Sequence, residues 1–159
     1  MKKLFTIFIL STIAYCASAQ EISVQKIEGL KALYNRNNDT TYIVNFFATW
    51  CRPCMEEMPV LKKFIEEHQA EKIQFIFVSL DGGGAITKLQ KYVKKQKITV
   101  PVILLNESSD FSWLPYIDKR WQGSIPATKV VNASKKVNAF LETPLEKGQL
   151  EYYLKQLGL

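Results

Sequence analysis

Two cysteines, Cys51 and Cys54, are separated by Arg52 and Pro53 in the first half of the chain. They follow an apolar run over residues 43–48 and precede a stretch with the apolar spacing of a helix. Unpaired N–H groups at a helix start stabilise a thiolate, and a second thiol three positions later lies within reach of a disulfide bond. The spacing predicts a redox dithiol in which Cys51, at the exposed helix start, is the nucleophile and Cys54 the resolving thiol.

The remaining cysteine, Cys16, lies in a segment typical of secretory signals. Residues 1–19 begin with a basic pair, continue with an apolar stretch too short to span a membrane, and end in the cleavage pattern Ala17-Ser18-Ala19. We expect this segment to be removed on export, which leaves residues 20–159 as one domain. Lipid attachment at Cys16 is the alternative, and Tyr15 disfavours it because lipoprotein signals carry a small residue at that place.

The overall charge and the neighbours of the cysteines exclude several classes of protein. The formal net charge of +6 falls to +4 without residues 1–19, because that segment holds two lysines and no acidic residue. Such a small excess does not indicate a nucleic-acid partner. Met55 stands where a c-type haem site needs histidine, and two cysteines with the single His68 make a poor zinc site. We expect no metal and no cofactor.

The elements that position the cysteines alternate between strand and helix patterns. Continuous apolar runs predict strands over residues 41–47, 73–80 and 100–105, and a polar turn joins a hairpin over residues 127–131 and 135–140. Helices are predicted over the following ranges: 29–34, 53–67, 85–96, 111–120 and 145–157. This order predicts an α/β fold with a mixed central sheet and helices on both faces.

Two distant blocks carry a resemblance to a known family. Residues 44–54, followed by Glu57-Met58-Pro59, and a later Ile-Pro pair within residues 123–128 resemble the thioredoxin-fold proteins of the extracytoplasmic TlpA/ResA type. A cysteine pair alone is a weak signal, whereas its combination with Trp50 and these other residues is specific. The resemblance covers essentially the whole chain after residue 19 and implies a thioredoxin-like domain.

The resemblance also assigns a role to Glu57, which lies one helical turn beyond Cys54. The matching family position carries a buried acid, which implies that the carboxyl of Glu57 holds or relays the proton of Cys54. Cytoplasmic thioredoxins carry a buried aspartate where this chain has Asn45, so proton handling would move to Glu57. The alternative is a surface glutamate like the neighbouring Glu56.

Further site residues are expected around the dithiol. Pro126 matches the cis-proline of the family, which would expose the backbone of Ile125 beside the sulfurs for pairing with an extended client segment. Trp50 is expected to flank this substrate-binding surface, with core packing as an equal alternative. Arg52 and Pro53 are expected to tune the redox balance, because a nearby cation favours the thiolate.

The resemblance implies a periplasmic or otherwise extracytoplasmic thiol-disulfide oxidoreductase, exported by its signal segment. We expect a monomer that reduces disulfide-bearing proteins and takes electrons from a membrane donor, since the family is mostly reducing. An oxidase or isomerase that donates disulfides is the alternative, because spacing does not fix the direction. A redox-inactive binding module is disfavoured, since a structural disulfide does not require Trp50, Glu57 and the Ile-Pro pair together. A thiol peroxidase is disfavoured because no threonine lies three residues before either cysteine.

Overall fold

The computed structural model describes residues 22–69 and 71–159. The signal segment expected over residues 1–19, including Cys16, lies outside the described residues. Within the described part of the chain, no helix has the length and apolar character needed to cross a membrane.

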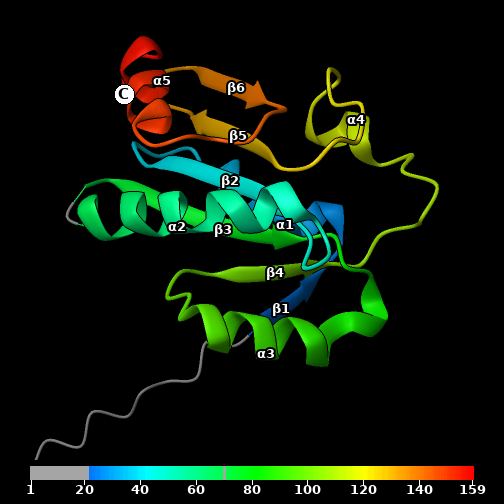
Figure 1. The fold of residues 1–159 in the computed structure, drawn as a ribbon. Helices are drawn as coiled ribbons and strands as arrows, with labels where there is room; N and C mark the ends of the chain where they lie inside the picture. The colour runs from blue at the N-terminus through cyan, green and yellow to red at the C-terminus, as the bar shows by residue number, and fades with distance from the viewer. Residues whose placement is uncertain (1–21, 70) are drawn as a thin grey trace, which may run out of the picture.

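A six-stranded sheet in the order β1-β4-β3-β2-β5-β6 forms the centre of the described structure (Figure 1). Its strands are β1 (Ile22–Gln25), β2 (Thr41–Phe47), β3 (Ile73–Ser79), β4 (Val102–Leu105), β5 (Ala127–Asn132) and β6 (Val137–Leu141). The first four strands in this order are mutually parallel, whereas β5 runs antiparallel to β2 and β6 runs antiparallel to β5. The predicted mixed sheet is confirmed.

The register of β2 brings distant parts of the chain together at one end of the central strands. Phe47, the last residue of β2, pairs with Ser79, the last residue of β3. The antiparallel β5 begins at this same end of the strands, where Ala127 pairs with Phe46. The residues that follow β2 and the residues that precede β5 therefore lie at the same end of the molecule.

Helices cover both faces of the sheet, as predicted. They are α1 (Ile27–Tyr34), α2 (Arg52–Glu67), α3 (Ile86–Gln96), α4 (Leu114–Ile117) and α5 (Gln149–Gln156), with a short 3₁₀ turn over Gly83–Ala85. Alternate residues of β2 face opposite cores, because side chains along a strand point to the two faces in turn. Ile43 and Phe47 contribute to the core under α2, α3 and α5, and Val44 and Phe46 to the core under α1 and α4.

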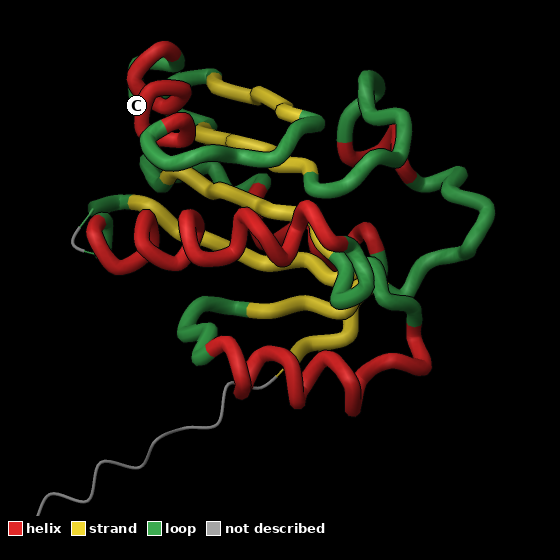
Figure 2. Tube along the Cα trace, viewed as in Figure 1, coloured by secondary structure: helices red, strands yellow, loops and turns green. Residues whose placement is uncertain are grey.

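The connection between β4 and β5 departs from the sequence-based expectation. The helix predicted over residues 111–120 is reduced to α4, which is a short interruption of a long loop (Figure 2). Phe111 has a φ of 58°, in the left-handed region, so the helix cannot begin there. At the other end Asp118 is extended, and its carboxylate accepts the backbone N–H of Arg120 at 3.0 Å.

Two other elements differ from the prediction by more than two residues. β1 was not predicted, because this strand has only four residues and its pairing with β4 involves a segment 80 residues later in the chain. The last helix begins at Gln149 instead of residue 145. Gly148, with a φ of 80°, breaks the helical backbone, and the preceding residues form a loop.

Candidate active site

Cys51 and Cys54 lie where β2 leads into α2 and are joined by a disulfide bond. Cys51 is the N-cap of α2, and its Sγ accepts the backbone N–H of Cys54 at 3.3 Å. Cys51 is 5% exposed, whereas Cys54 is completely buried. Of the two cysteines at the helix start, Cys51 therefore keeps a small exposed area and Cys54 has none.

Asp81, two residues after the end of β3, holds Thr49, which lies two residues before Cys51. Its carboxylate accepts the backbone N–H of Thr49 at 3.0 and 3.1 Å and the hydroxyl of Ser79 at 2.6 Å. The hydroxyl of Thr49 also donates to it at 2.5 Å. Sequence reasoning missed this contact because the partners are 32 residues apart and an aspartate before a glycine run indicates only a turn.

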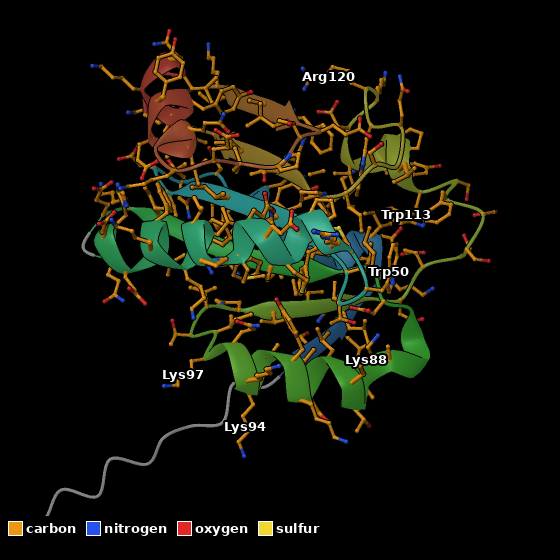
Figure 3. The ribbon with its side chains drawn as sticks, viewed as in Figure 1. Trp50, Lys88, Lys94, Lys97, Trp113 and Arg120 are labelled. Atoms are coloured by element: carbon orange, nitrogen blue, oxygen red, sulfur yellow. A yellow bond between two sulfur atoms is a disulfide. The ribbon has the colours of Figure 1, made fainter. Side chains whose placement is uncertain are left out.

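The side chains on either side of Cys51 are exposed. Trp50 is 65% exposed at the end of the molecule where β2 meets α2 (Figure 3), so the core-packing alternative for this residue is wrong. Arg52 is also exposed, and its guanidinium Nε pairs with the Glu56 carboxylate at 2.8 Å. Pro53 lies in the first turn of α2, where its missing N–H removes no intrahelical hydrogen bond.

The Ile-Pro pair before β5 reaches the dithiol. The bond between Ile125 and Pro126 is cis, Ile125 is half-buried and Pro126 is buried. The carbonyl oxygen of Ile125 lies 3.6 Å from the Sγ of Cys51. The structure thus brings together two sequence blocks that are more than 70 residues apart.

Glu57 is 3% exposed, so the surface alternative for this residue is wrong. Its Oε1 accepts a hydrogen bond from the Nδ2 of Asn45 at 2.9 Å, and its Oε2 accepts the backbone N–H of Leu145 at 2.8 Å. Asn45 also donates to the Oγ1 of Thr128 at 3.1 Å. Hydrogen-bonded polar side chains therefore connect β5, β2 and α2 inside the core.

The environment of Glu57 contains hydrogen-bond donors but no counter-ion among the described residues. Burial raises the pKa of the Glu57 carboxyl, and the hydrogen bonds from Leu145 and Asn45 offset only part of this rise. The Oδ1 atom of Asn45 is buried and has no hydrogen-bond partner in the described part of the chain. The site therefore combines a dithiol at a helix start with a buried carboxyl that protonates more readily than an exposed one.

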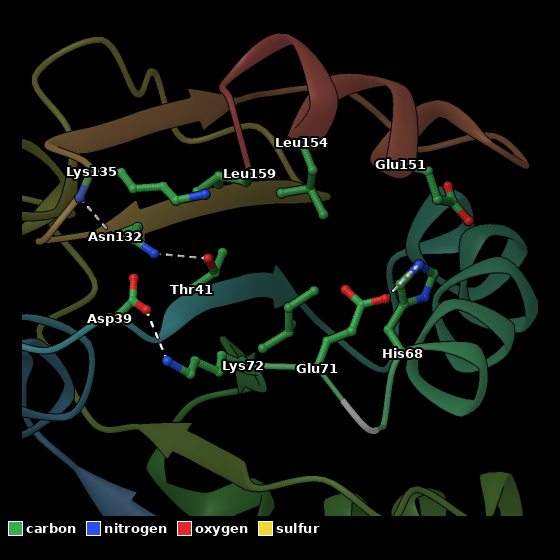
Figure 4. A pocket seen from close by; sticks show the side chains of 11 residues that line it. Asp39, Thr41, His68, Glu71, Lys72, Asn132, Lys135, Glu151, Leu154 and Leu159 are labelled. Atoms are coloured by element: carbon green, nitrogen blue, oxygen red, sulfur yellow. Dashed lines mark hydrogen bonds and ion pairs between the residues drawn. The ribbon is translucent and has the colours of Figure 1, made fainter.

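A cavity of about 300 Å³ lies at the opposite end of the central strands (Figure 4). Its lining includes Thr41, where β2 begins, and Asn132, where β5 ends. Two of the charged residues there form an ion pair, Lys72 with Asp39 at 3.0 Å. This cavity is remote from Cys51, which follows the other end of β2, and has no part in the dithiol site.

Comparisons with known proteins agree with this geometry. Over 116 residues the chain is 26% identical to the thiol-disulfide oxidoreductase ResA of Oceanobacillus iheyensis, covering 73% of this chain and 56% of that protein. It is 28% identical to sporulation thiol-disulfide oxidoreductase A of Bacillus subtilis, covering 65% of this chain and 70% of that protein.

The fold is also shared with solved structures. A thioredoxin family thiol:disulfide interchange protein from Chlorobium tepidum superposes with a TM-score of 0.59 at 28% identity, covering 75% of this chain and 80% of that chain. The predicted thioredoxin-like fold and the resemblance to ResA-type proteins are confirmed. Residues 17–140 match the AhpC/TSA family, which is most of the chain, and the chain therefore belongs to this family.

Proposed function

We propose that this chain is an extracytoplasmic thiol-disulfide oxidoreductase that reduces disulfide bonds of other proteins. The observation that carries the proposal is the Cys51–Cys54 disulfide at the start of α2, in which Cys54 is completely buried and Cys51 keeps a small exposed area. The names of the relatives, thiol-disulfide oxidoreductases, support the same reaction.

The reaction starts from the reduced chain. The thiolate of Cys51 attacks one sulfur of a client disulfide, that S–S bond breaks, and the first client sulfur leaves as a thiolate. Cys54 then loses its proton and attacks the Sγ of Cys51, which breaks the mixed disulfide and releases the second client thiolate. The client gains two electrons and its thiolates take up two protons, while this chain is left with the disulfide seen in the structure.

Glu57 is the proton acceptor for Cys54 in this scheme. It lies on α2 three residues beyond Cys54, so both side chains share one face of the helix. Its buried carboxyl, with a raised pKa, is a better base once ionised than an exposed glutamate. Asn45 supports the carboxylate through the 2.9 Å hydrogen bond to Oε1.

The backbone N–H and C=O of Ile125 are the groups with which an extended client segment would pair, and we call them the client-binding edge. The Ile125 carbonyl lies 3.6 Å from the Sγ of Cys51, so an extended client segment that pairs with this edge would place its disulfide over Cys51. The exposed indole of Trp50 adds apolar contact area at the same end of the molecule. Arg52 and Pro53 would adjust the redox balance less than Glu57, because Arg52 is exposed and already paired with Glu56.

Export and electron supply complete the proposal. Removal of residues 1–19 would place the domain of residues 20–159 in the periplasm or another extracytoplasmic compartment, where its clients carry disulfides. A dithiol on a membrane protein would reduce the Cys51–Cys54 bond after each turnover. We propose that the chain works as a monomer, without metal or cofactor.

Reduction of insulin by the mature protein, with dithiothreitol as electron donor, tests the activity. We expect Cys51→Ser to abolish the catalysed rate, because serine cannot form the mixed disulfide. A variant with unchanged activity would exclude Cys51 as the nucleophile.

The direction of electron flow is tested separately by equilibrating the Cys51–Cys54 pair against glutathione. A reduction potential of about −220 mV or lower would support a reductase, and a value near −120 mV would indicate a disulfide donor.

A further inference from the structure

The turn that precedes Ile125 is held by two side chains from different parts of the chain. The backbone N–H of Ser124 donates to the Oε1 of Glu142 at 2.7 Å. The carbonyl oxygen of Ser124 accepts the indole N–H of Trp121 at 2.9 Å. Both polar backbone groups of Ser124 are therefore fixed, and the next residue is the proposed client-binding edge.

Glu142 holds this turn at a second point. Its two carboxylate oxygens accept the backbone N–H of Gln122, each at 3.2 Å. Gly123 lies between the two donors with a φ of 98°, a conformation that favours glycine and that turns both N–H groups toward one carboxylate. The 2.7 Å bond from Ser124 has the length of a charge-assisted hydrogen bond, so Glu142 restrains the turn chiefly at Ser124.

Trp121 anchors the other side of the turn in the core. It is 5% exposed, and its ring centroid lies 4.6 Å from that of Phe46 and 5.4 Å from that of Phe140. Phe46 belongs to β2, the strand that leads to Cys51. The carbonyl of Ser124 is thus tied to the same strand that positions the dithiol.

Glu142 also belongs to the segment that contacts Glu57. It follows β6 directly, and three residues later the backbone N–H of Leu145 donates to the Oε2 of Glu57 at 2.8 Å. One short loop therefore contacts the turn before Ile125 with a side chain and the buried acid with its backbone.

We propose that Glu142 is a positioning residue that sets the place of the Ile125 edge relative to the Sγ of Cys51, and so favours extended protein disulfides over small ones. The inference rests on the proposed function. A small disulfide needs only access to Cys51, whereas an extended client also needs the Ile125 backbone at hydrogen-bond distance. Loss of Glu142 would leave the turn held by Trp121 alone and add an ordering cost to the binding of an extended client.

The test measures steady-state turnover of the full chain, with dithiothreitol as electron donor and its uncatalysed reaction subtracted, on two disulfides: an extended peptide with a disulfide bridge and 2-hydroxyethyl disulfide. Glu142→Ala is expected to raise the KM for the peptide about five- to tenfold, with kcat unchanged, because ordering of the edge is then part of binding. The rate with 2-hydroxyethyl disulfide and the reduction potential are expected to stay as in the unchanged chain.

Two further variants separate positioning from folding. Glu142→Gln keeps an oxygen acceptor for Ser124 but loses the second carboxylate oxygen, so its KM is expected to lie between those of the unchanged chain and Glu142→Ala. Glu146→Ala removes a carboxylate of the same loop that has no hydrogen bond or ion pair within residues 22–69 and 71–159, and it serves as the matched control.

Two results would overturn the inference. One is a KM for the peptide that is the same in all variants, and another is an equal loss with both disulfides, which indicates damage to the dithiol itself. If the unchanged chain reduces neither disulfide, the proposed function fails first. If it reduces both and Glu142→Ala does not discriminate between them, only the role of Glu142 fails.

Discussion

Glu57 and Lys129 are both 3% exposed, yet these two buried ionisable groups have different kinds of partner. Glu57 lies under α2 and is held by an amide and a backbone N–H. Lys129 lies in β5, and its Nζ is 3.4 Å from the carboxylate of Asp118 and 2.7 Å from the Oδ1 of Asn138. Among the residues that the structure describes, Glu57 has only neutral partners, whereas Lys129 has a counter-ion.

The difference sets how each group responds to protons. Burial raises the pKa of Glu57, and neutral donors offset only part of the rise. Burial lowers the pKa of Lys129, but the charge of Asp118 opposes this change. Asp118 in turn has a pKa well below its usual range, chiefly because Arg120, labelled in Figure 3, donates to it. A group without a counter-ion is suited to proton exchange, and a compensated pair is suited to holding structure.

The largest effect is expected from Glu57→Gln, which removes the proton acceptor but keeps the size of the side chain. We expect the rate of disulfide reduction at pH 7 to fall about 100-fold, in the range typical of general bases. The rise of the rate with pH through the raised pKa of Glu57 is expected to disappear in this variant. Glu66→Gln, which changes an exposed glutamate of the same helix, is the control, and a pH-rate profile common to all three proteins would contradict the role of Glu57.

Asp118→Asn tests the compensated pair. It leaves the charge of Lys129 buried without its carboxylate, so we expect the free energy of unfolding in urea to fall by about 3 kcal/mol. The second change Lys129→Met, made in the Asp118→Asn chain, is expected to restore part of this loss, because it removes the uncompensated charge. Equal stabilities of the single and double variants would show that Asp118 does not act through Lys129.

The smallest effect is expected in the pH dependence of stability. The folded state binds the proton of Glu57 more tightly than the unfolded state, because the folded pKa is raised. The free energy of unfolding is expected to fall as the pH rises from the ordinary carboxyl pKa to the raised one, by at most about 1.4 kcal/mol per pH unit, and then to level off. Urea unfolding of Glu57→Gln across this pH range is expected to lack this fall in the free energy of unfolding. The same dependence on pH in both proteins would contradict the assignment to Glu57.

The dithiol and its supporting strand could be predicted because their signals are local. The run over residues 41–47 is continuously apolar and β-branched, and the structure places β2 at these residues. The resemblance pointed to the Ile-Pro pair, and the structure places the Ile125 carbonyl 3.6 Å from Cys51. Proton handling by Glu57 and the client-binding role of Ile125 stay predictions.

The contacts that hold the site could not be predicted, because their partners are distant backbone groups. Glu142 accepts N–H groups that lie 18 and 20 residues earlier, and Leu145 donates to a carboxylate 88 residues away. A backbone N–H is common to every residue except proline, so it leaves no pattern in a sequence. The shortened α4 has a similar cause, since the positive φ of Phe111 has no signature in its residue type.

The complete burial of Cys54 has a practical consequence for identifying partners. After attack on a client, the covalent complex is resolved when the buried sulfur of Cys54 attacks the Sγ of Cys51, an intramolecular step that needs no second thiol from solution. Replacing Cys54 with serine would remove that release and leave each client attached through Cys51. The same packing that keeps turnover orderly thus makes this chain suitable as a covalent bait for its own substrates.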